Sequence, residues 1–567
     1  MPNTSAAPRT PKRRRLWQAT KWSLLVISLI VATIAGAAIY MIRSPIVVPE
    51  WLETRIEERF AKDMPLARIG FGEMVLIVDE GWRPRVRLRD VNITNPQGVS
   101  FAAFREVRAS FSIQGLLAGD VQPRDIAMSG VVANLRRDKD GRVALSAASG
   151  TAPAERRAAT MPQLIGQLDT VFETKALSRL RSIELRALTL RYTDLQSDRM
   201  WTVDGGRLLL DREGDNLRMT AELAVLGGGA DVATLSANYS SKIGDTASQF
   251  GVNFDGVSAG DIAVQNPAFA WLKVLRASIS GSVRSSLDED GTFEPLNATL
   301  QIGAGVVQPN ERATPIPFDG ARSYFSYDPD QRLLRFDELS VESKWVSGRI
   351  EGAASLGIDD SGKLGELVAQ VRLRDLVADP ADIYDTPVSI EGADLDAKIT
   401  FNPFHMSVGR MAIVDGGTTL NLSGDLRAGP QGGQVALDAG LNALKPARLL
   451  ELWPENVKPK TRKWVDENIY AGALSDVDLA FRLKPGETPQ TYLDFDFQGA
   501  EVRFLRTMPN ITDGSGHASL SRNRFVVSVD TGVITPPDET PVSVNGSSFI
   551  MPDVTVKDGP PGIVRLR

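Results

Sequence analysis

Apolar and polar residues alternate one by one over long parts of this chain. The alternation is clearest in four stretches, which begin at Val107, Leu217, Leu296 and Leu493. A period of two places successive side chains on opposite faces of a strand. Each stretch therefore predicts a strand with one apolar and one polar face, as in antiparallel sheets. A change of phase around Asp90 predicts a β-bulge.

Helical periodicity is rare by comparison. Short helices are predicted at 50–61, 160–180, 267–275 and 460–470. These helices are too few to cover the apolar face of a long sheet. Either two sheets close on each other as a sandwich, or one sheet curls and its apolar face holds something else.

Acidic tetrapeptides with a final glycine separate several predicted strands. They are DKDG at 138–141, DEDG at 288–291 and DDSG at 359–362. We interpret them as hairpin turns, because aspartate tolerates turn geometry and glycine supplies a positive φ. They lack the twelve-residue spacing and final glutamate of a calcium loop.

A weak repeat runs through the second half of the chain. In each copy a strand ends in a polar loop, a short proline-containing helix follows, and a glycine opens the next strand. The copies lie at 254–281, 373–392 and 441–472. Units that pair mainly with their neighbours are typical of elongated, quasi-linear structures.

The N-terminal region has a different pattern. Residues 22–42, from Trp22 to Ile42, form an uncharged apolar run, which at 1.5 Å per residue would span roughly 30 Å. Six basic residues and no acidic residue precede it. The positive-inside bias therefore predicts a cytoplasmic tail at 1–21, a transmembrane helix at 22–42 and an exported body. The alternative is a cleaved signal peptide with its small-residue site at 35–37.

Charge and composition exclude several classes of function. The whole chain has a net charge of −6, and the 58 basic and 70 acidic residues beyond residue 21 leave −12. An acidic body does not attract a polyphosphate, so we expect no nucleic-acid partner. Cysteine is absent, which excludes disulfides, thiol nucleophiles and thiolate metal sites.

The sequence offers no convincing active site. His405 and His517 are the only histidines, and both are expected on strand faces rather than in a metal site. The string GVSAG at 256–260 matches the short pattern of a hydrolase elbow around Ser258. The stretch that follows, 261–266, reads as a loop instead of the required helix. We therefore predict no catalytic residue, no metal and no cofactor, and the chain is not expected to be an enzyme.

Several short motifs resemble a known family. Trp82-Arg83-Pro84, the strand VRLRDVNI at 86–93, and LLAG at 116–119 are similar to the opening module of AsmA-like proteins. The blocks LWP at 452–454, TRKWV at 461–465 and NIYAG at 468–472 resemble the YhdP branch of that family. The family also includes TamB and resembles eukaryotic chorein-type bridge proteins.

This resemblance implies a mainly β fold with a long, curled antiparallel sheet, a few short helices and a hydrophobic groove. It also implies a function. The protein would be a single-pass protein of the bacterial inner membrane with a periplasmic body, and would move phospholipids to the outer membrane. Outer-membrane or envelope proteins are possible partners at the far end. The alternative is a non-enzymatic scaffold or regulator of envelope assembly, built from closed β-sandwich modules.

The expected organisation beyond residue 42 has three parts. They are an AsmA-like β module at 43–150, a helix followed by a β-groove segment at 151–250, and repeated, YhdP-like β-groove segments at 251–567. Seven inward apolar residues are predicted to line the groove; if the sheet is closed, they form sandwich core instead. They are Phe111, Ile113, Leu223, Val225, Leu300, Phe495 and Phe497.

Overall fold

The computed structural model carries side chains and describes most of the chain beyond residue 67. The described residues are 21, 25–34, 36, 40, 46–48, 54, 68–78, 84–94, 100–111, 122–139, 143–147, 154–156, 172, 177–227, 232–308, 315–359, 362–379, 383–384, 386–401, 403–429, 432–537, 540–556 and 561–567.

The described part of the predicted membrane segment consists of 25–34, 36 and 40, and all of these residues are helical. Nowhere in the described ranges is a helix both long and apolar enough to cross a membrane. The other residues of 22–42 lie outside those ranges, and so do most residues of the helices predicted at 50–61 and 160–180.

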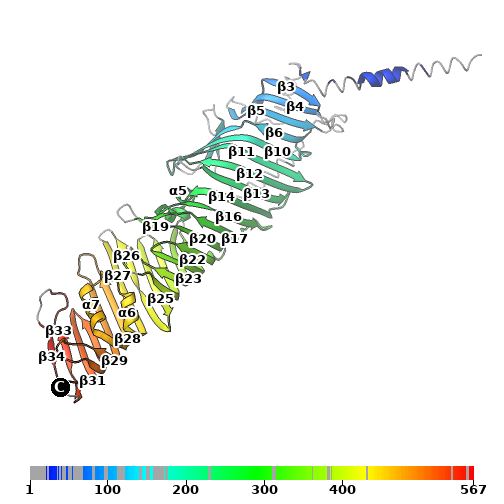
Figure 1. The fold of residues 1–567 in the computed structure, drawn as a ribbon. Coiled ribbons are helices and arrows are strands. Elements are labelled where there is room, and N and C mark those ends of the chain that lie inside the picture. The colour runs from blue at the N-terminus through cyan, green and yellow to red at the C-terminus, as the bar shows by residue number, and fades with distance from the viewer. Residues whose placement is uncertain are drawn as a thin grey trace, which may run out of the picture. The chain divides into compact units, whose positions relative to one another are not determined.

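The protein is mainly β and divides into two units, Met1–Ser248 and Gln249–Arg567 (Figure 1). In unit 1, neighbouring strands pair in the order β3, β4, β5, β6, β10, β11, β12, β13. The strands of unit 1 are β1 (Ile46–Val47), β2 (Arg68–Gly70), β3 (Glu73–Val78), β4 (Pro84–Thr94), β5 (Ser100–Phe111), β6 (Pro123–Ser129), β7 (Val132–Arg137), β8 (Val143–Ala147), β9 (Ala154–Arg156), β10 (Ser182–Asp194), β11 (Arg199–Glu213), β12 (Asn216–Leu226) and β13 (Val232–Lys242).

The sheet of unit 1 is mixed, so the prediction of a purely antiparallel sheet is wrong. Strands β6 and β7 both pair with β10 in parallel, whereas the other pairings in this unit are antiparallel across the described strands. A parallel pair requires a long crossover, and the chain between β7 and β10 supplies more than 40 residues. Strand alternation carries no information on the direction of a neighbouring strand, which is why the sequence did not reveal this junction.

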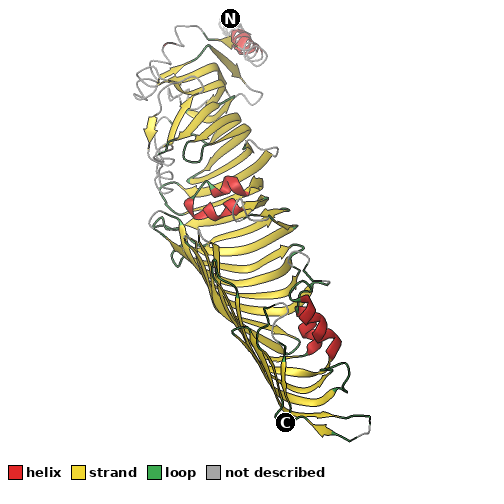
Figure 2. Cartoon of the chain, turned by 90° about the vertical axis from the view of Figure 1, so that its left-hand side faces the viewer, coloured by secondary structure: helices red, strands yellow, loops and turns green. Residues whose placement is uncertain are grey.

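Unit 2 is built from one long run of antiparallel strands, β16, β17 and β20 to β31, with β33 and β34 beyond them, and β15, β18 and β19 form a separate small sheet (Figure 2). Its strands are β14 (Ser248–Ser258, beginning at the unit boundary), β15 (Leu275–Arg276), β16 (Ser278–Leu287), β17 (Leu296–Ile302), β18 (Gly305–Val307), β19 (Ile316–Phe318), β20 (Gly320–Asp328), β21 (Leu333–Glu342), β22 (Val346–Ile358), β23 (Leu364–Ala378), β24 (Val388–Phe401), β25 (Phe404–Asp415), β26 (Thr418–Gly429), β27 (Gly432–Leu444), β28 (Ile469–Leu483), β29 (Gln490–Val502), β30 (Ile511–Ser521), β31 (Arg524–Ile534), β32 (Val542–Ser543), β33 (Ser548–Met551) and β34 (Ile563–Arg565). Its helices are α5 (Ala259–Ala263), the 3₁₀ helix η1 (Pro267–Val274), α6 (Pro446–Leu452) and α7 (Pro459–Asn468).

The predicted helices at 267–275 and 460–470 are confirmed as η1 and α7. Each begins with a proline, whose fixed φ suits the first turn of a helix. The prediction of a loop at 261–266 is wrong in its first part, because α5 occupies Ala259–Ala263. Ala259 and Ala263 lie four apart on one face and are buried, a pattern too short to be recognised from periodicity.

The two long edges of the unit 2 sheet differ. Successive strands are antiparallel, so alternate connections lie at the same edge. One edge carries tight hairpins, including the predicted turns at 288–291 and 359–362, where the N–H of Gly291 and of Gly362 donates to the Asp288 and Asp359 carbonyl. The opposite edge, here called the insertion edge, receives α5 with η1, the β18–β19 pair, the connection between β23 and β24, and α6 with α7.

Residues with positive φ interrupt many strands in mid-course. Asp90 has a φ of 52° in β4, and Asp375 has a φ of 52° at the same place in the second VRLRD string, in β23. The register between β4 and β5 shifts a little later, between Ile93 and Thr94. Such bulges increase local twist and let a strand change the face that it presents. The irregularity predicted at Asp90 is therefore present, although the register shift lies beyond it.

Candidate functional site

Apolar side chains form continuous rows across the strands of unit 1. Directly paired residues of neighbouring strands project from the same face of a sheet. One row runs through eight strands and contains Leu76, Val86, Ala109, Ile126, Ile183, Leu210, Met219 and Tyr239. A second row on the same face contains Met74, Leu88, Val107, Met128, Leu185, Leu208, Ala221 and Ala237.

Unit 2 contains a longer row, here called the central row. It crosses fifteen paired strands, from β16 to β33, and every member is apolar or glycine. Its members are Val283, Ala298, Phe325, Phe336, Gly352, Val371, Leu395, Met411, Leu422, Ala439, Leu479, Leu493, Leu520, Phe525 and Met551.

A parallel row lies two residues along each strand from the central row, except on β21, where a register shift makes the spacing three residues. Ser323 is its one polar member from β16 to β28. The members are Gly281, Leu300, Ser323, Leu339, Ile350, Leu373, Ala393, Ile413, Leu420, Leu441 and Val477. Together the rows make one apolar face. At about 4.8 Å per strand, fourteen spacings of the central row correspond to roughly 67 Å of sheet.

The degree of burial shows that this face is not the interior of a sandwich. Of the central row only Ala298 is buried, and the larger side chains, such as Phe336 and Leu422, keep part of their surface exposed. Leu479 is 37% exposed. In two sheets packed face to face, inner side chains of this size interdigitate and lose almost all contact with solvent. Among the described residues, the other sheet is made of the three short strands β15, β18 and β19, which are too few to cover the face.

Two small clusters do cover parts of the apolar face. In unit 1, Phe172 and Leu180 are almost fully buried against Leu210 and Leu217. In unit 2, Ala259 and Ala263 of α5 and Leu272 of η1 pack on Ile279, with Leu300 and Ile302 against them. Both clusters involve short helical or turn segments, and each reaches only a few strands.

Six of the seven predicted groove residues are described, and they lie on the apolar faces of the two units in different settings. Phe495 lies two residues from Leu493 of the central row on β29 and pairs with Ala518, and Phe497 pairs with Leu474 and with Gly516. Leu223 pairs with Leu235, and Val225 pairs with Val203 and Ala233, all in unit 1. Phe111 is half-buried at the end of β5, and Ile113 lies outside the described residues.

Leu300 differs from the other predicted groove residues, because it packs against the cluster under α5. It is therefore partly covered by protein, and only the structure could reveal this, since α5 was not recognised. The central row was also missed as a unit. The apolar alternation is visible in the sequence of each strand. Which residues of neighbouring strands lie side by side, however, follows only from the strand register.

A hollow of about 740 Å³ follows β25 to β30 in unit 2. Along each strand its lining joins a member of the central row, such as Leu479, to the residues one position away, such as Asp478 and Ala480. Residues one position from the central row, among them Asn421, Asp438 and Asp494, make up most of the lining, so the hollow opens on the polar face, opposite the apolar rows. A volume of this size lies within the range of about 300–1,000 Å³ that is common for ligand pockets.

Comparison with known proteins gives no relative. No family model matches this chain, and neither does any curated protein or solved structure. The case for a function therefore depends on the geometry of the apolar face and on the residues around it.

The opposite face of unit 2 is polar and carries exposed ion pairs. Arg372 Nε lies 3.0 Å from Asp394 Oδ1, and Lys398 Nζ lies 2.8 Å from Glu366 Oε2. Each partner is between 41% and 59% exposed, so these pairs contribute little to stability. They place charged groups on this face, which also exposes some hydrophobic side chains, among them Val368, Val414 and Tyr492.

Both histidines lie on strands, as predicted, and both contact carboxylates. His405 Nε2 is 2.5 Å from Asp425 Oδ1, a hydrogen bond that lowers the pKa of Asp425. His517 Nδ1 is 2.8 Å from Asp496 Oδ1, and its Nε2 is 3.1 Å from Asp494 Oδ2. The hydrogen bond to Asp496 and the nearby charges outweigh desolvation and raise the pKa of His517.

The alternatives with a chemical step gain no support from these contacts. Ser258 is exposed at the start of the five-residue helix α5, and its side chain makes no capping hydrogen bond. Both histidines are engaged by aspartates from neighbouring strands. Within the described ranges, no group of three or more His, Asp or Glu side chains is arranged to hold a metal ion.

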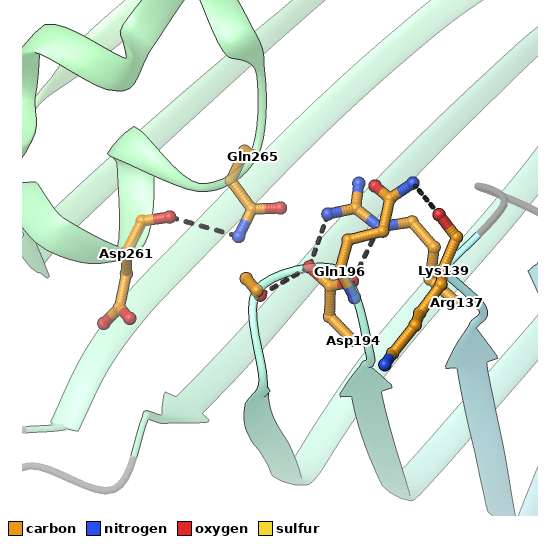
Figure 3. A network of polar contacts seen from close by, with 7 residues as sticks. Arg137, Lys139, Asp194, Gln196, Asp261 and Gln265 are labelled. Atoms are coloured by element: carbon orange, nitrogen blue, oxygen red, sulfur yellow. Dashed lines mark hydrogen bonds and ion pairs between the residues drawn. The ribbon is translucent and has the colours of Figure 1, made fainter.

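One buried ion pair secures the parallel junction of unit 1 (Figure 3). The Asp194 side chain has no exposed surface and accepts two hydrogen bonds from the Arg137 guanidinium. Ser197 Oγ donates to it over 2.6 Å, and the Gln196 N–H donates over 3.0 Å. Burial raises the pKa of Asp194, but these hydrogen bonds lower it more. The Gln265 side-chain amide in the same view donates to the carbonyl of Asp261, at the end of α5.

Proposed function

We propose that this protein is a membrane-anchored periplasmic lipid-transfer bridge, in which the apolar sheet face carries phospholipid acyl chains between the inner and outer membranes. One observation carries the proposal: each unit has continuous apolar rows, and most of the large side chains in the central row of unit 2 stay partly exposed. A soluble protein rarely leaves such a large apolar surface without a ligand or a partner.

The free energy of binding an acyl chain on such a surface allows lipid transfer without a chemical reaction. Burying an acyl chain is worth about 0.8 kcal/mol per CH₂, so ~15 carbons gain roughly 12 kcal/mol. A bilayer holds the same chain about equally well, so movement between the two is nearly isoenergetic. The unbroken rows matter because a polar gap would interrupt the apolar path. The charged head group can remain at the rim, in contact with water.

The membrane anchor and the periplasmic location are parts of the same proposal. They derive from the apolar run at 22–42 and from the basic residues that precede it. The second candidate, a non-enzymatic scaffold of envelope assembly, would use the same apolar face to bind protein. The insertion edge of unit 2, with its exposed helices, is the feature that favours this second candidate.

Interrupting the central row tests the transfer function. The full chain with Leu422→Asp and Leu479→Asp is assayed for transfer of a fluorescent phospholipid between vesicles. We expect transfer to fall to the rate without protein, because two carboxylates on the apolar path oppose passage of an acyl chain. The matched control is Asn421→Asp with Ala480→Asp, next to these positions on the opposite face. Equal transfer by both double variants would contradict the proposal.

A further inference from the structure

The helix α7 and the connection that precedes it carry an exposed surface that the apolar rows do not explain. It consists of Val457, Lys458, Lys460, Lys463 and Trp464, here called the edge patch. Val457 is 50% exposed and Trp464 is 43% exposed, and the three lysines are exposed as well. In α7, residues 460, 463 and 464 are three and four apart, which places them on one side of the helix.

The local charge of the edge patch opposes that of the rest of the body. Residues 456–464 contain four basic residues and no acidic residue, in a chain whose part beyond residue 21 carries −12. Arg462 is used internally, because its guanidinium donates to the carbonyls of Trp453 and Leu450. Lys463 faces Glu467 at 3.6 Å, in an exposed pair. In sequence, Glu455 and Asp466 are the nearest remaining acidic residues. Glu455 Oε1 lies 3.4 Å from a terminal nitrogen of Arg462.

The edge patch is held in place by the fold. Trp453 Nε1 donates to the Val457 carbonyl over 2.7 Å, which closes the turn between α6 and α7. At the other end of α7, Arg503 Nε donates to Asn468 Oδ1 over 3.1 Å. Val465, on the inner side of α7, is buried. The lysines and the tryptophan are therefore presented by a helix that is anchored on both sides.

We infer that the edge patch docks on an anionic lipid surface. Lysines beside an exposed tryptophan and an aliphatic side chain are typical of helices that lie in a membrane interface. The lysines match anionic head groups, and the tryptophan ring suits the head-group level of a bilayer. The patch lies at the insertion edge rather than on the apolar face, so this binding is separate from the proposed transport of acyl chains.

Capture of vesicles by the full chain tests this inference. The protein is held on beads through an N-terminal tag, so that every variant presents the same N-terminal segment. Fluorescent vesicles of phosphatidylcholine with phosphatidylglycerol are compared with vesicles of phosphatidylcholine alone. Each lysine near an anionic surface contributes roughly five-fold to partitioning, so replacing Lys458, Lys460 and Lys463 by alanine is expected to lower capture on the order of 100-fold. High salt should reduce capture by the unmodified chain.

Two controls separate the edge patch from general effects. Lys363→Ala with Lys484→Ala removes exposed lysines at the hairpin edge and should leave capture unchanged. Trp271→Ala removes a tryptophan that is 51% exposed in η1 and should have little effect, whereas Trp464→Ala should reduce capture several-fold.

Three results would overturn the inference. They are equal capture of both vesicle types, equal capture by the triple-alanine variant, and binding of an acidic protein without capture of vesicles. The lipid-transfer rate of the Leu422 and Leu479 variant reports on the apolar face independently, so failure of one proposal is distinguishable from failure of the other.

Discussion

At the scale of single residues, the best-supported interaction is the buried pair of Arg137 and Asp194. It joins the ends of β7 and β10, two strands that are far apart in sequence and parallel in the sheet. Removing one partner of a buried ion pair leaves the other charge without compensation. This pair therefore determines the stability of a junction that local sequence patterns do not specify.

We expect Asp194→Ala to destabilise unit 1 by about 3–5 kcal/mol, because Arg137 would stay largely buried without its carboxylate. Thermal unfolding and amide exchange of β7 and β10 measure the effect. The matched control is Asp394→Ala, which removes the acid of an exposed pair and should cost about 0–1 kcal/mol. Equal losses of stability for the two substitutions would show that the buried pair contributes no more to stability than an exposed pair.

The pairing of His517 with Asp494 and Asp496 predicts a dependence on pH. Its pKa is raised above 6.5 in the folded protein, so folding favours the protonated form. The added stability is fully present below about pH 6.5, the pKa of a free histidine, and disappears as the pH rises through the raised pKa.

An NMR titration measures this directly, since His517→Gln assigns the two histidine signals. We expect a midpoint for His517 above 6.5, and faster amide exchange across β29 and β30 on the alkaline side of that midpoint. A midpoint at or below 6.5 would exclude the charged pairing.

At the scale of strands, glycines at bulges allow the sheet to bend. Gly352 has a φ of 142°, and a Cβ at this position would lie 2.3 Å from the Gln370 carbonyl oxygen on the next strand. The register between β21 and β22 shifts beside it. Gly352 also belongs to the central row, so the close approach occurs in the floor of the apolar face.

Gly352→Ala is expected to destabilise unit 2 by about 1–3 kcal/mol, because it combines a strained φ with a clash against a backbone atom. Gly365→Ala on β23 is the matched control, since the nearest atom to its added Cβ would be 3.7 Å away. Chemical denaturation of both variants checks the prediction. A smaller loss for Gly352→Ala than for Gly365→Ala would rule out this role of Gly352.

Much of the element pattern could be predicted from sequence alone. The alternating stretch that begins at Leu296 is the strand β17, Leu296–Ile302, because strict alternation after an acidic turn identifies a strand. The helix α7 was recognised from its length and periodicity. By contrast, α5 is only five residues long, and the parallel pairing of β10 depends on contacts across some 50 residues.

The apolar face illustrates the limit of such reasoning. Alternation shows which residues of one strand share a face, but not which residues of the next strand stand beside them. Register shifts at positions such as Gly352 and Gly424 change that pairing. Single apolar residues of the face could therefore be predicted from the sequence of their own strand. The central row could be identified only once the strand register was known.

At the scale of the whole molecule, the proposed lipid transfer requires that lipid chains occupy the apolar face in the cell. A closed sandwich would bury the central row, yet side chains as large as Phe525 remain partly exposed. Protein partners and lipid chains are the two occupants proposed for this face. They differ in chemistry, so a covalent trap placed on this face can identify the occupant directly.

The most direct measurement places a photo-crosslinking amino acid at Leu395 or Leu422 in the full chain, followed by irradiation in cells and mass spectrometry. Adducts with phospholipid are expected at both positions, which face the apolar side. Asp394 and Asn421, adjacent on the same strands but on the polar face, should give none. Protein adducts alone at Leu395 and Leu422, or lipid adducts in equal yield at all four positions, would contradict transport along the apolar face.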